Sequence, residues 1–156
     1  MRVPSLGVGS PEPMNRVEFH YNIGDKYRYL RLLLSKVMDR DMTALVICPP
    51  EQVAVLDERL WADDPASFLP HCPAGAAQTT RLATPIWLSA EAPEGHDRQV
   101  LVNCGTMLPE GPGPVQRWLE LVSTDPADAQ AGRQRWRHYQ ARGLVIEPHD
   151  RAGRGQ

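Results

Sequence analysis

Two short runs of apolar residues, at positions 44–48 (ALVIC) and 100–104 (VLVNC), constrain the fold of this chain most strongly. Neither run alternates apolar with polar residues, and such a run indicates a strand that is covered on both faces. Strands of this kind are typical of parallel sheets that carry helices above and below. The two runs therefore predict the centre of an α/β sheet.

The segments around these runs alternate between strand and helix patterns. Further strands are predicted over residues 17–22 (VEFHYN), 84–90 (TPIWLSA), 118–122 (WLELV) and 144–147 (LVIE), the last as an edge strand. Helices are predicted after Asp25, over residues 51–61, and from the STDP segment at 123–126 to about Arg142, before Gly143. Residues 75–81 are expected to form a loop. The alternation predicts a Rossmann-like, open and largely parallel sheet with helices on both faces.

A sheet of this type often binds nucleotides, but the phosphate-binding loop is missing. The first strand-to-helix junction reads NIGDK, with Gly24 as its single glycine. A dinucleotide or P-loop site needs several glycines, whose backbone N–H groups surround the phosphates. We therefore expect no nucleotide cofactor.

The length of 156 residues indicates one domain, and the net charge of −2 argues against a basic nucleic-acid binder. We expect a disordered leader over residues 1–13, an α/β domain over 14–150 and a flexible tail over 151–156, with Met14 as an alternative start. No apolar run approaches 18 residues, so we expect no membrane contact. The three cysteines are odd in number and far apart, which favours free thiols in the cytoplasm.

The sequence offers no convincing metal site or catalytic site. His71 and Cys72 are adjacent, and no further pair stands at zinc-ligand spacing, because the other histidines are scattered. Cys48 and Cys104 end apolar strands, where a cysteine is most often a small buried side chain. We expect no catalytic residue, no metal and no cofactor.

Residues 60–72 (LWADDPASFLPHC) place aromatic side chains among residues that form turns. Trp61 and Phe68 could simply be core residues, which is the commoner fate of large aromatic side chains. A stiff, aromatic connection is also well suited to docking another protein, because little entropy is lost on binding. Both interpretations remain open at this point.

Residues 133–143 (RQRWRHYQARG) form the second informative segment, with four arginines and no acid. Arg133, Trp136, Arg137 and Gln140 fall on one face of the predicted helix. Cations near the end of a helix also complement its dipole, which accounts for Arg142. The remaining arginines and aromatic residues indicate a site for an acidic ligand that carries an aromatic group.

The segments LDERLWADDPASFLPH (56–71) and RQRWRHYQARG, in this order and separation, resemble the chi subunit of bacterial DNA polymerase III. The resemblance extends from about residue 14 to residue 150. It implies a Rossmann-like accessory subunit without catalytic residues of its own, within a DNA-directed DNA polymerase complex. It also implies two partners: the psi subunit, which tethers chi to the clamp loader, and the acidic C-terminal tail of single-stranded DNA-binding protein (SSB). DNA would then be contacted only indirectly.

The resemblance also assigns residues by position. The site for the SSB tail would comprise Phe68, Val122, Arg133, Trp136 and Arg137. Docking of a further partner would involve Trp61, Pro70, His71 and Tyr139. One basic position of the family pattern is Ala129 here, so affinity for the tail is expected to be lower unless Arg135 compensates. The alternative function is direct binding of single-stranded nucleic acid by the Arg/Trp/Tyr helix.

Overall fold

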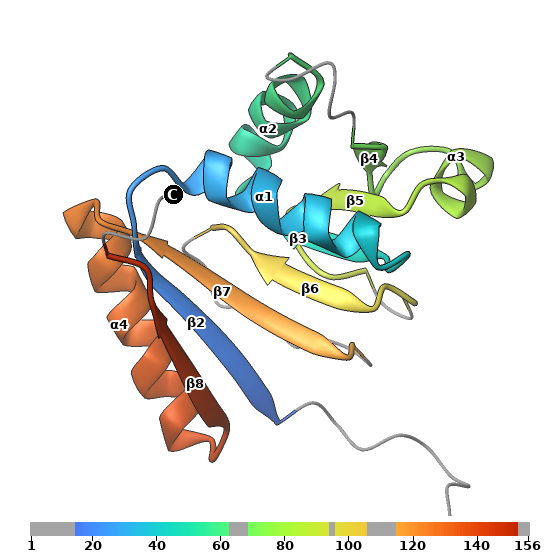
Figure 1. Cartoon of the computed structure of the whole chain (residues 1–156). Helices are drawn as coiled ribbons and strands as arrows, with labels where there is room; N and C mark the ends of the chain where they lie inside the picture. Colours follow the sequence, from blue (N-terminus) through green and yellow to red (C-terminus); the bar gives the residue numbers. More distant parts are fainter. Residues whose placement is uncertain (1–14, 63–68, 94–95, 106–114, 153–156) are drawn as a thin grey trace, which may run out of the picture.

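The described residues form one open, seven-stranded parallel sheet with helices on both faces (Figure 1). The structure, a computed structural model, describes residues 15–62, 69–93, 96–105 and 115–152, without the side chains of Trp61 and Ala62. The strands are β2 (Arg16–Ile23), β3 (Ala44–Ile47), β4 (His71–Pro73), β5 (Ile86–Ser89), β6 (Val100–Asn103), β7 (Arg117–Ser123) and β8 (Val145–Asp150). The helices are α1 (Lys26–Asp39), α2 (Pro50–Ala62), α3 (Gln78–Ala83) and α4 (Pro126–Ala141).

The fold class predicted from the sequence is confirmed, and so are the strands predicted from apolar patterns. The two continuous apolar runs become β3 and β6, which are buried along their whole length near the centre of the sheet. Two elements were not predicted, and the expected loop over residues 75–81 is wrong from Gln78 onward. Strand β4 has only three residues, too few to show a pattern, and α3 buries no side chain and so lacks apolar periodicity.

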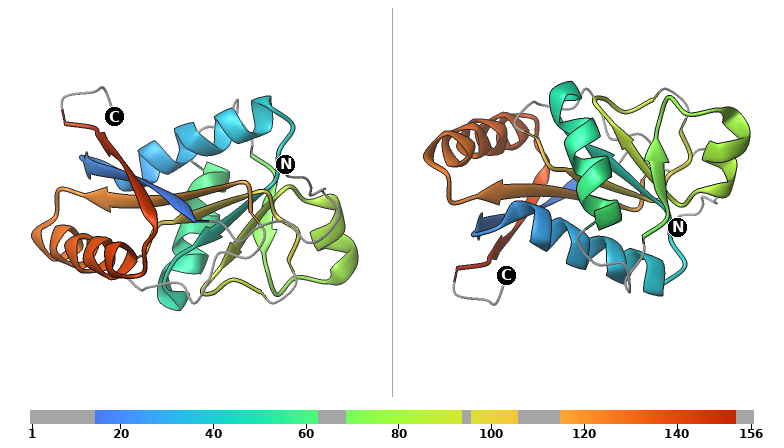
Figure 2. Two further views of the ribbon diagram at one scale, coloured as in Figure 1. Left: turned by 90° about the horizontal axis from the view of Figure 1, so that it is seen from below. Right: turned by 90° about the horizontal axis from the view of Figure 1, so that it is seen from above.

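The order of the strands, β4-β5-β3-β6-β7-β2-β8, explains why the helices lie on opposite faces. The chain moves toward the β4 edge through α1 and α2, and it moves back toward the β8 edge through α3 and α4. With right-handed crossovers, a reversal of direction moves the connecting helix to the other face. The core accordingly has two halves, one beneath α1 and α2 and one beneath α4. Figure 2 shows α1 and α4 on opposite sides of the sheet.

The helices begin and end where the sequence predicts. Asp25 and Asp125 accept a backbone hydrogen bond as N-caps of α1 and α4. Beyond α4, Gly143 adopts a φ of 81°, and the backbone N–H groups of Gly143 and Leu144 donate to Gln140 and Tyr139. This is a Schellman ending, which glycine adopts without strain. Within the described residues, no helix has the length and apolar character that crossing a bilayer requires.

Candidate functional site

Strands β2 and β7 are neighbours, and the helices that follow them, α1 and α4, cover opposite faces of the sheet. In open α/β sheets, such a reversal leaves a crevice at the carboxyl ends of the strands, where ligands usually bind. Here the crevice lies between residues 21–23 of β2, residues 122–123 of β7 and the first turns of α4. The topology therefore predicts a ligand site between β2, β7 and α4.

A pocket of about 510 Å³ opens on the α4 side of this junction. Its lining residues are Phe19, Tyr21, Asn22, Val122, Ser123, Ala129, Gly132, Arg133, Trp136 and Arg137. Four of the five residues predicted for the tail site are thus brought together, namely Val122, Arg133, Trp136 and Arg137. The fifth, Phe68, lies outside the described residues.

The apolar floor of the pocket depends on residues that the sequence did not single out. Phe19 is buried on β2, and its ring lies 5.1 Å from that of Trp136 between centroids. Alternation along β2 turns Phe19 and Tyr21 to the α4 face of the sheet. The alternation was visible in the sequence, but the pairing of β2 with β7 was not, so Phe19 could not be assigned to this site.

Gly132 sets the distance between α4 and β7. A Cβ atom at this position would lie 2.8 Å from Cγ2 of Val122. Glycine inside a helix usually costs about 1 kcal/mol relative to alanine, so its presence here reflects the close approach of helix to strand. Gly132 is thus part of the pocket because of its contact with β7, which no local sequence pattern indicates.

The arginines of α4 divide between the surface and the core. Arg133 and Arg137 are exposed at the rim of the pocket, whereas Arg135 is 1% exposed. The Nε of Arg135 donates to Oε1 of Glu120 at 2.7 Å. Arg135 is thus committed to the core, and the expectation that it compensates for Ala129 at the pocket is wrong.

The two carboxylate oxygens of Glu120 accept four hydrogen bonds, from side chains of β6, β7 and α4. Oε1 accepts from Arg135 and from Nδ2 of Asn103, at 2.9 Å. Oε2 accepts from Nε1 of Trp118 and from the hydroxyl of Tyr139, both at 2.9 Å. Burial raises the pKa of Glu120, while Arg135, Trp118 and Tyr139 oppose that shift by stabilising the carboxylate. The network ties α4 to β6 and β7 behind the pocket.

The residues predicted for partner docking lie in different environments. Tyr139 is 1% exposed, and its ring packs against Phe19 and Trp118, so it is a core residue rather than a docking residue. His71 is also buried, in β4, and Pro70 is partly exposed. The side chain of Trp61 lies outside the described residues.

The positions where a nucleotide phosphate would bind hold acids instead. Asp25 caps α1, and Asp128, in the first turn of α4, pairs with Nζ of Lys26 at 2.8 Å. Asp128 also accepts from the backbone N–H of Ser123 at 2.7 Å. Burial raises the pKa of Asp128, but the bonds from Lys26 and Ser123 more than offset this and lower it. The carboxylates occupy the helix N-termini that bind anions in nucleotide sites.

The three cysteines are buried and unbridged, as the sequence predicts. Burial raises the pKa of Cys48 to about 12 and that of Cys104 to about 11. Thiols with such pKa values hold almost no thiolate at neutral pH, and the thiolate is the reactive form. Neither cysteine has the ionisation that nucleophilic catalysis needs.

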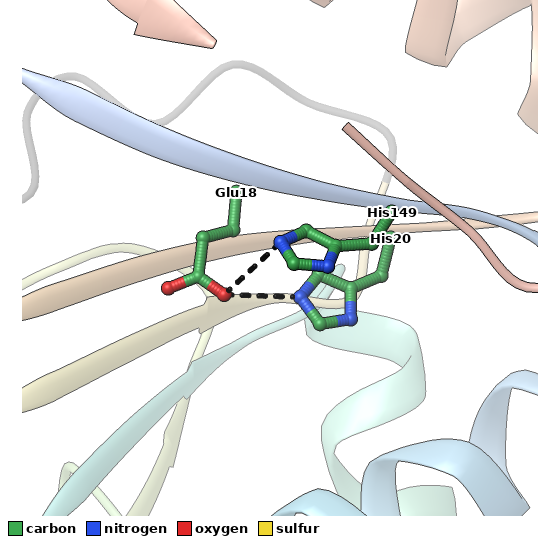
Figure 3. A group of neighbouring side chains, drawn as sticks. All are labelled: Glu18, His20 and His149. Carbon is green, nitrogen blue, oxygen red and sulfur yellow. Dashed lines mark hydrogen bonds and ion pairs between the residues drawn. The ribbon is translucent and has the colours of Figure 1, made fainter. Parts of the chain in front are cut away.

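On the other face of β2, a second group of chemically active side chains consists of Glu18, His20 and His149 (Figure 3). Their ligand-type atoms all lie within 4.8 Å of one another. Glu18 also accepts two hydrogen bonds from Arg117, at 3.0 and 2.8 Å. Among the described residues, this is the group of His, Cys, Asp and Glu side chains with the geometry to hold a metal ion.

Comparison with known proteins agrees with the resemblance drawn from the sequence. The family model described as DNA polymerase III chi subunit, HolC, matches residues 14–147. A relative named DNA polymerase III subunit chi, from Pseudomonas aeruginosa, is 32% identical over 121 residues, or 75% of this chain and 80% of that protein. A second relative of that name, from Haemophilus influenzae, is 31% identical over 103 residues, or 64% of this chain and 69% of that protein.

Proposed function

Because the chain belongs to the family of DNA polymerase III chi subunits, we propose that it is a non-catalytic accessory subunit of the replicative polymerase. In this role it connects the clamp loader, through the psi subunit, to the acidic C-terminal tail of SSB. The observation that carries the proposal is the pocket between β2, β7 and α4, which has an apolar floor and an arginine rim.

The chemistry of an acidic tail with a terminal aromatic residue matches this pocket. Phe19, Val122 and Trp136 form an apolar surface for the aromatic side chain. Arg133 and Arg137 can pair with the terminal carboxylate and the acids before it, and no acidic residue lines the described pocket to oppose them. Charge-assisted bonds contribute about 1.5–3 kcal/mol each, so two of them plus apolar burial support roughly micromolar binding.

Ala129 leaves the pocket with fewer cations than the family pattern provides. It lines the pocket where that pattern has a basic residue, and Arg135 points into the core. Two exposed guanidinium groups, those of Arg133 and Arg137, therefore carry the electrostatic part of recognition. We expect weaker binding than in a relative with the third cation, and a strong dependence on salt.

For the psi subunit we propose a docking segment that includes Trp61 and Pro70. Pro70 directly precedes β4, the strand at the opposite edge of the sheet. His71 holds the end of this segment in place through contacts of its buried imidazole ring. Its Nδ1 lies 2.5 Å from the carbonyl oxygen of Leu69. Its Nε2 lies 3.0 Å from Oδ1 of Asp57 on α2. These contacts fix residues 69–71 against α2, so His71 positions the docking segment instead of touching the partner.

The tail assignment is tested by titrating the full chain with a fluorescent peptide of the SSB tail and recording anisotropy. Arg133→Ala and Trp136→Ala should each weaken binding about tenfold or more, because each removes one of the contacts described above. Arg142→Ala is the matched control, since it removes an exposed arginine of the same helix region that does not line the pocket. A peptide without its terminal Phe should also bind more weakly.

Two results would contradict the assignment: no saturable binding of the intact peptide, or equal losses in Arg142→Ala and Arg133→Ala. Direct binding of single-stranded nucleic acid is tested in the same format with a labelled oligonucleotide. Because Arg135 and Tyr139 are buried, one arginine and the tyrosine of this helix cannot contact the nucleic acid that the alternative requires. Tight binding of the naked oligonucleotide at physiological salt, unaffected by the peptide, would favour the alternative.

A further inference from the structure

Strands β2 and β8 carry the same short pattern, Glu-x-His, at the same register. Glu18 pairs with Glu147 and His20 pairs with His149 across the parallel ladder. Residues two apart on a strand share a face, so the four side chains form a two-by-two block on one side of the sheet. The histidines stand 129 positions apart in the sequence, and only the pairing of β2 with β8 brings them together.

The nitrogen and oxygen atoms of this block already stand close to the spacing of a metal site. Nε2 of His20 lies 3.2 Å from Oε1 of Glu18, and Nε2 of His149 lies 3.8 Å from the same oxygen. Four ligands at about 2.0–2.1 Å from a tetrahedral ion are separated by about 3.3 Å. Figure 3 shows the two imidazole rings stacked, each directed at one carboxylate oxygen of Glu18.

We propose that Glu18, His20 and His149 bind a divalent transition-metal ion of the zinc class and so join the edge strand β8 to β2. Two imidazoles and one carboxylate are a common ligand set for Zn²⁺, and a water or Glu147 completes four ligands. Oε1 of Glu147 lies 3.2 Å from Nε2 of His149. Mg²⁺ and Ca²⁺ prefer all-oxygen sites and are disfavoured here.

The surroundings of the ligands have the features of a metal site. Nδ1 of His20 is hydrogen-bonded to the hydroxyl of Tyr29, which fixes the ring and directs Nε2 toward Glu18. The imidazole ring of His20 is buried and stacks on that of His149, with ring centroids 4.5 Å apart. The carboxylate of Glu18 is held in place by two hydrogen bonds from Arg117.

Two arginines limit the affinity. Arg117 shares Glu18 with the ion, and Arg151 adds a second positive charge beside His20. The side chain of His149 is 36% exposed, so an ion reaches the site from the β8 edge. We therefore expect moderate affinity, set by the two imidazoles together with one shared carboxylate.

The test is a calorimetric titration of the chelator-treated full chain with Zn²⁺ at pH 7.5. We expect saturable binding of one ion per chain and a higher Tm when the ion is present. His149→Gln should weaken binding at least about tenfold, and Tyr29→Phe, which frees His20 from its orienting bond, about tenfold. His138→Gln is the matched control, since His138 is exposed on α4 outside the block and its loss should leave binding unchanged.

Co²⁺ provides an independent readout, because a tetrahedral N/O site gives visible absorption bands that thiolate ligands alter. Circular dichroism of His149→Gln confirms that the variant is folded before its affinity is interpreted. The proposal is overturned by absence of saturable Zn²⁺ binding, by binding of equal affinity in folded His149→Gln, or by thiolate-to-cobalt absorption that points to the cysteines.

Discussion

Glu120 is the residue that holds the wall of the pocket in place. Its carboxylate is completely buried, and it binds α4 through Arg135 and Tyr139 and the sheet through Asn103 and Trp118. A buried ion pair adds little net stability relative to an apolar pair, but breaking it leaves an uncompensated charge in the core. Glu120 is therefore important because every donor around it depends on the carboxylate.

Replacing Glu120 with Gln should lower the free energy of unfolding by about 3–5 kcal/mol, because Arg135 is left charged and buried. Urea denaturation measures this loss. Adding Arg135→Met should restore part of the stability, since it removes the uncompensated charge. Glu58→Gln, at an exposed position, is the control and should change stability by no more than about 0.5 kcal/mol. Equal effects of Glu120→Gln and Glu58→Gln would contradict this account.

Glu18 makes the stability of the fold decrease at acidic pH. Burial raises the pKa of Glu18, but hydrogen bonds from His20 and Arg117 more than offset this and lower it from 4.5 to about 2. A depressed carboxyl pKa contributes stability above the unfolded value, and this contribution is lost as pH falls from about 4.5 to about 2. The shift corresponds to about 3 kcal/mol. Urea midpoints at pH 7 and pH 2.5 should therefore differ less in Glu18→Gln than in the unsubstituted chain, and an unchanged difference would refute the assignment.

At the scale of elements, the contact between α4 and β7 determines whether the pocket stays open. Gly132→Ala should lower the free energy of unfolding by about 1–3 kcal/mol through overpacking, reduced by the better helix propensity of alanine. It should also weaken binding of the tail peptide, because the new methyl group pushes α4 away from Val122. Adding Val122→Ala to Gly132→Ala should restore the free energy of unfolding, because it removes the clash with the new methyl group. It should not restore peptide affinity, because Val122 is part of the apolar floor of the pocket. A stabilised Gly132→Ala variant with full peptide affinity would contradict this.

Most elements could be predicted because their residues carry local patterns. The runs at β3 and β6, the caps Asp25 and Asp125, and the stop at Gly143 all act over a few residues. Strand β4 could not be predicted because it is too short to show alternation, and helix α3 could not be predicted because it buries no side chain. Elements that are stabilised by packing against their neighbours, and not by a pattern in their own residues, cannot be predicted from local sequence.

The candidate site was only partly predictable for a related reason. Arg133, Trp136 and Arg137 share one helix, so spacing alone groups them. Phe19 joins them through the pairing of β2 with β7, and His20 meets His149 through the pairing of β2 with β8. Pairings between distant strands depend on the packing of the whole sheet, which no short segment encodes.

At the scale of the whole molecule, the described parts of the two proposed docking regions lie at opposite ends of the strand order. The pocket uses β2 and β7, near the β8 edge, whereas Pro70 precedes β4, the other edge strand. The described residues assigned to the two regions do not overlap. Under the proposed function, we therefore expect the chain to hold both partners at once instead of exchanging one for the other.

We therefore expect the psi subunit and the SSB tail to bind simultaneously. The Kd of the labelled tail peptide, measured by anisotropy, should change by less than about twofold when saturating psi is added, since none of the described residues is assigned to both regions. Arg133→Ala should abolish much of the peptide affinity and leave psi binding intact. Displacement of the peptide by psi would show that the two sites overlap.

The place of β2 in the sheet has a consequence for the synthesis of this protein. The strand lies between β7 and β8, and Arg117, which binds Glu18, is translated 99 residues later. At a translation rate of about 5–20 residues per second, roughly 5 to 20 seconds pass after the synthesis of β2 before β7, the first strand that pairs with it, is synthesised. Phe19 and Trp136 then meet only when α4 has emerged. An incomplete chain that lacks α4 consequently has no complete pocket, because Arg133, Trp136 and Arg137 all belong to this last helix.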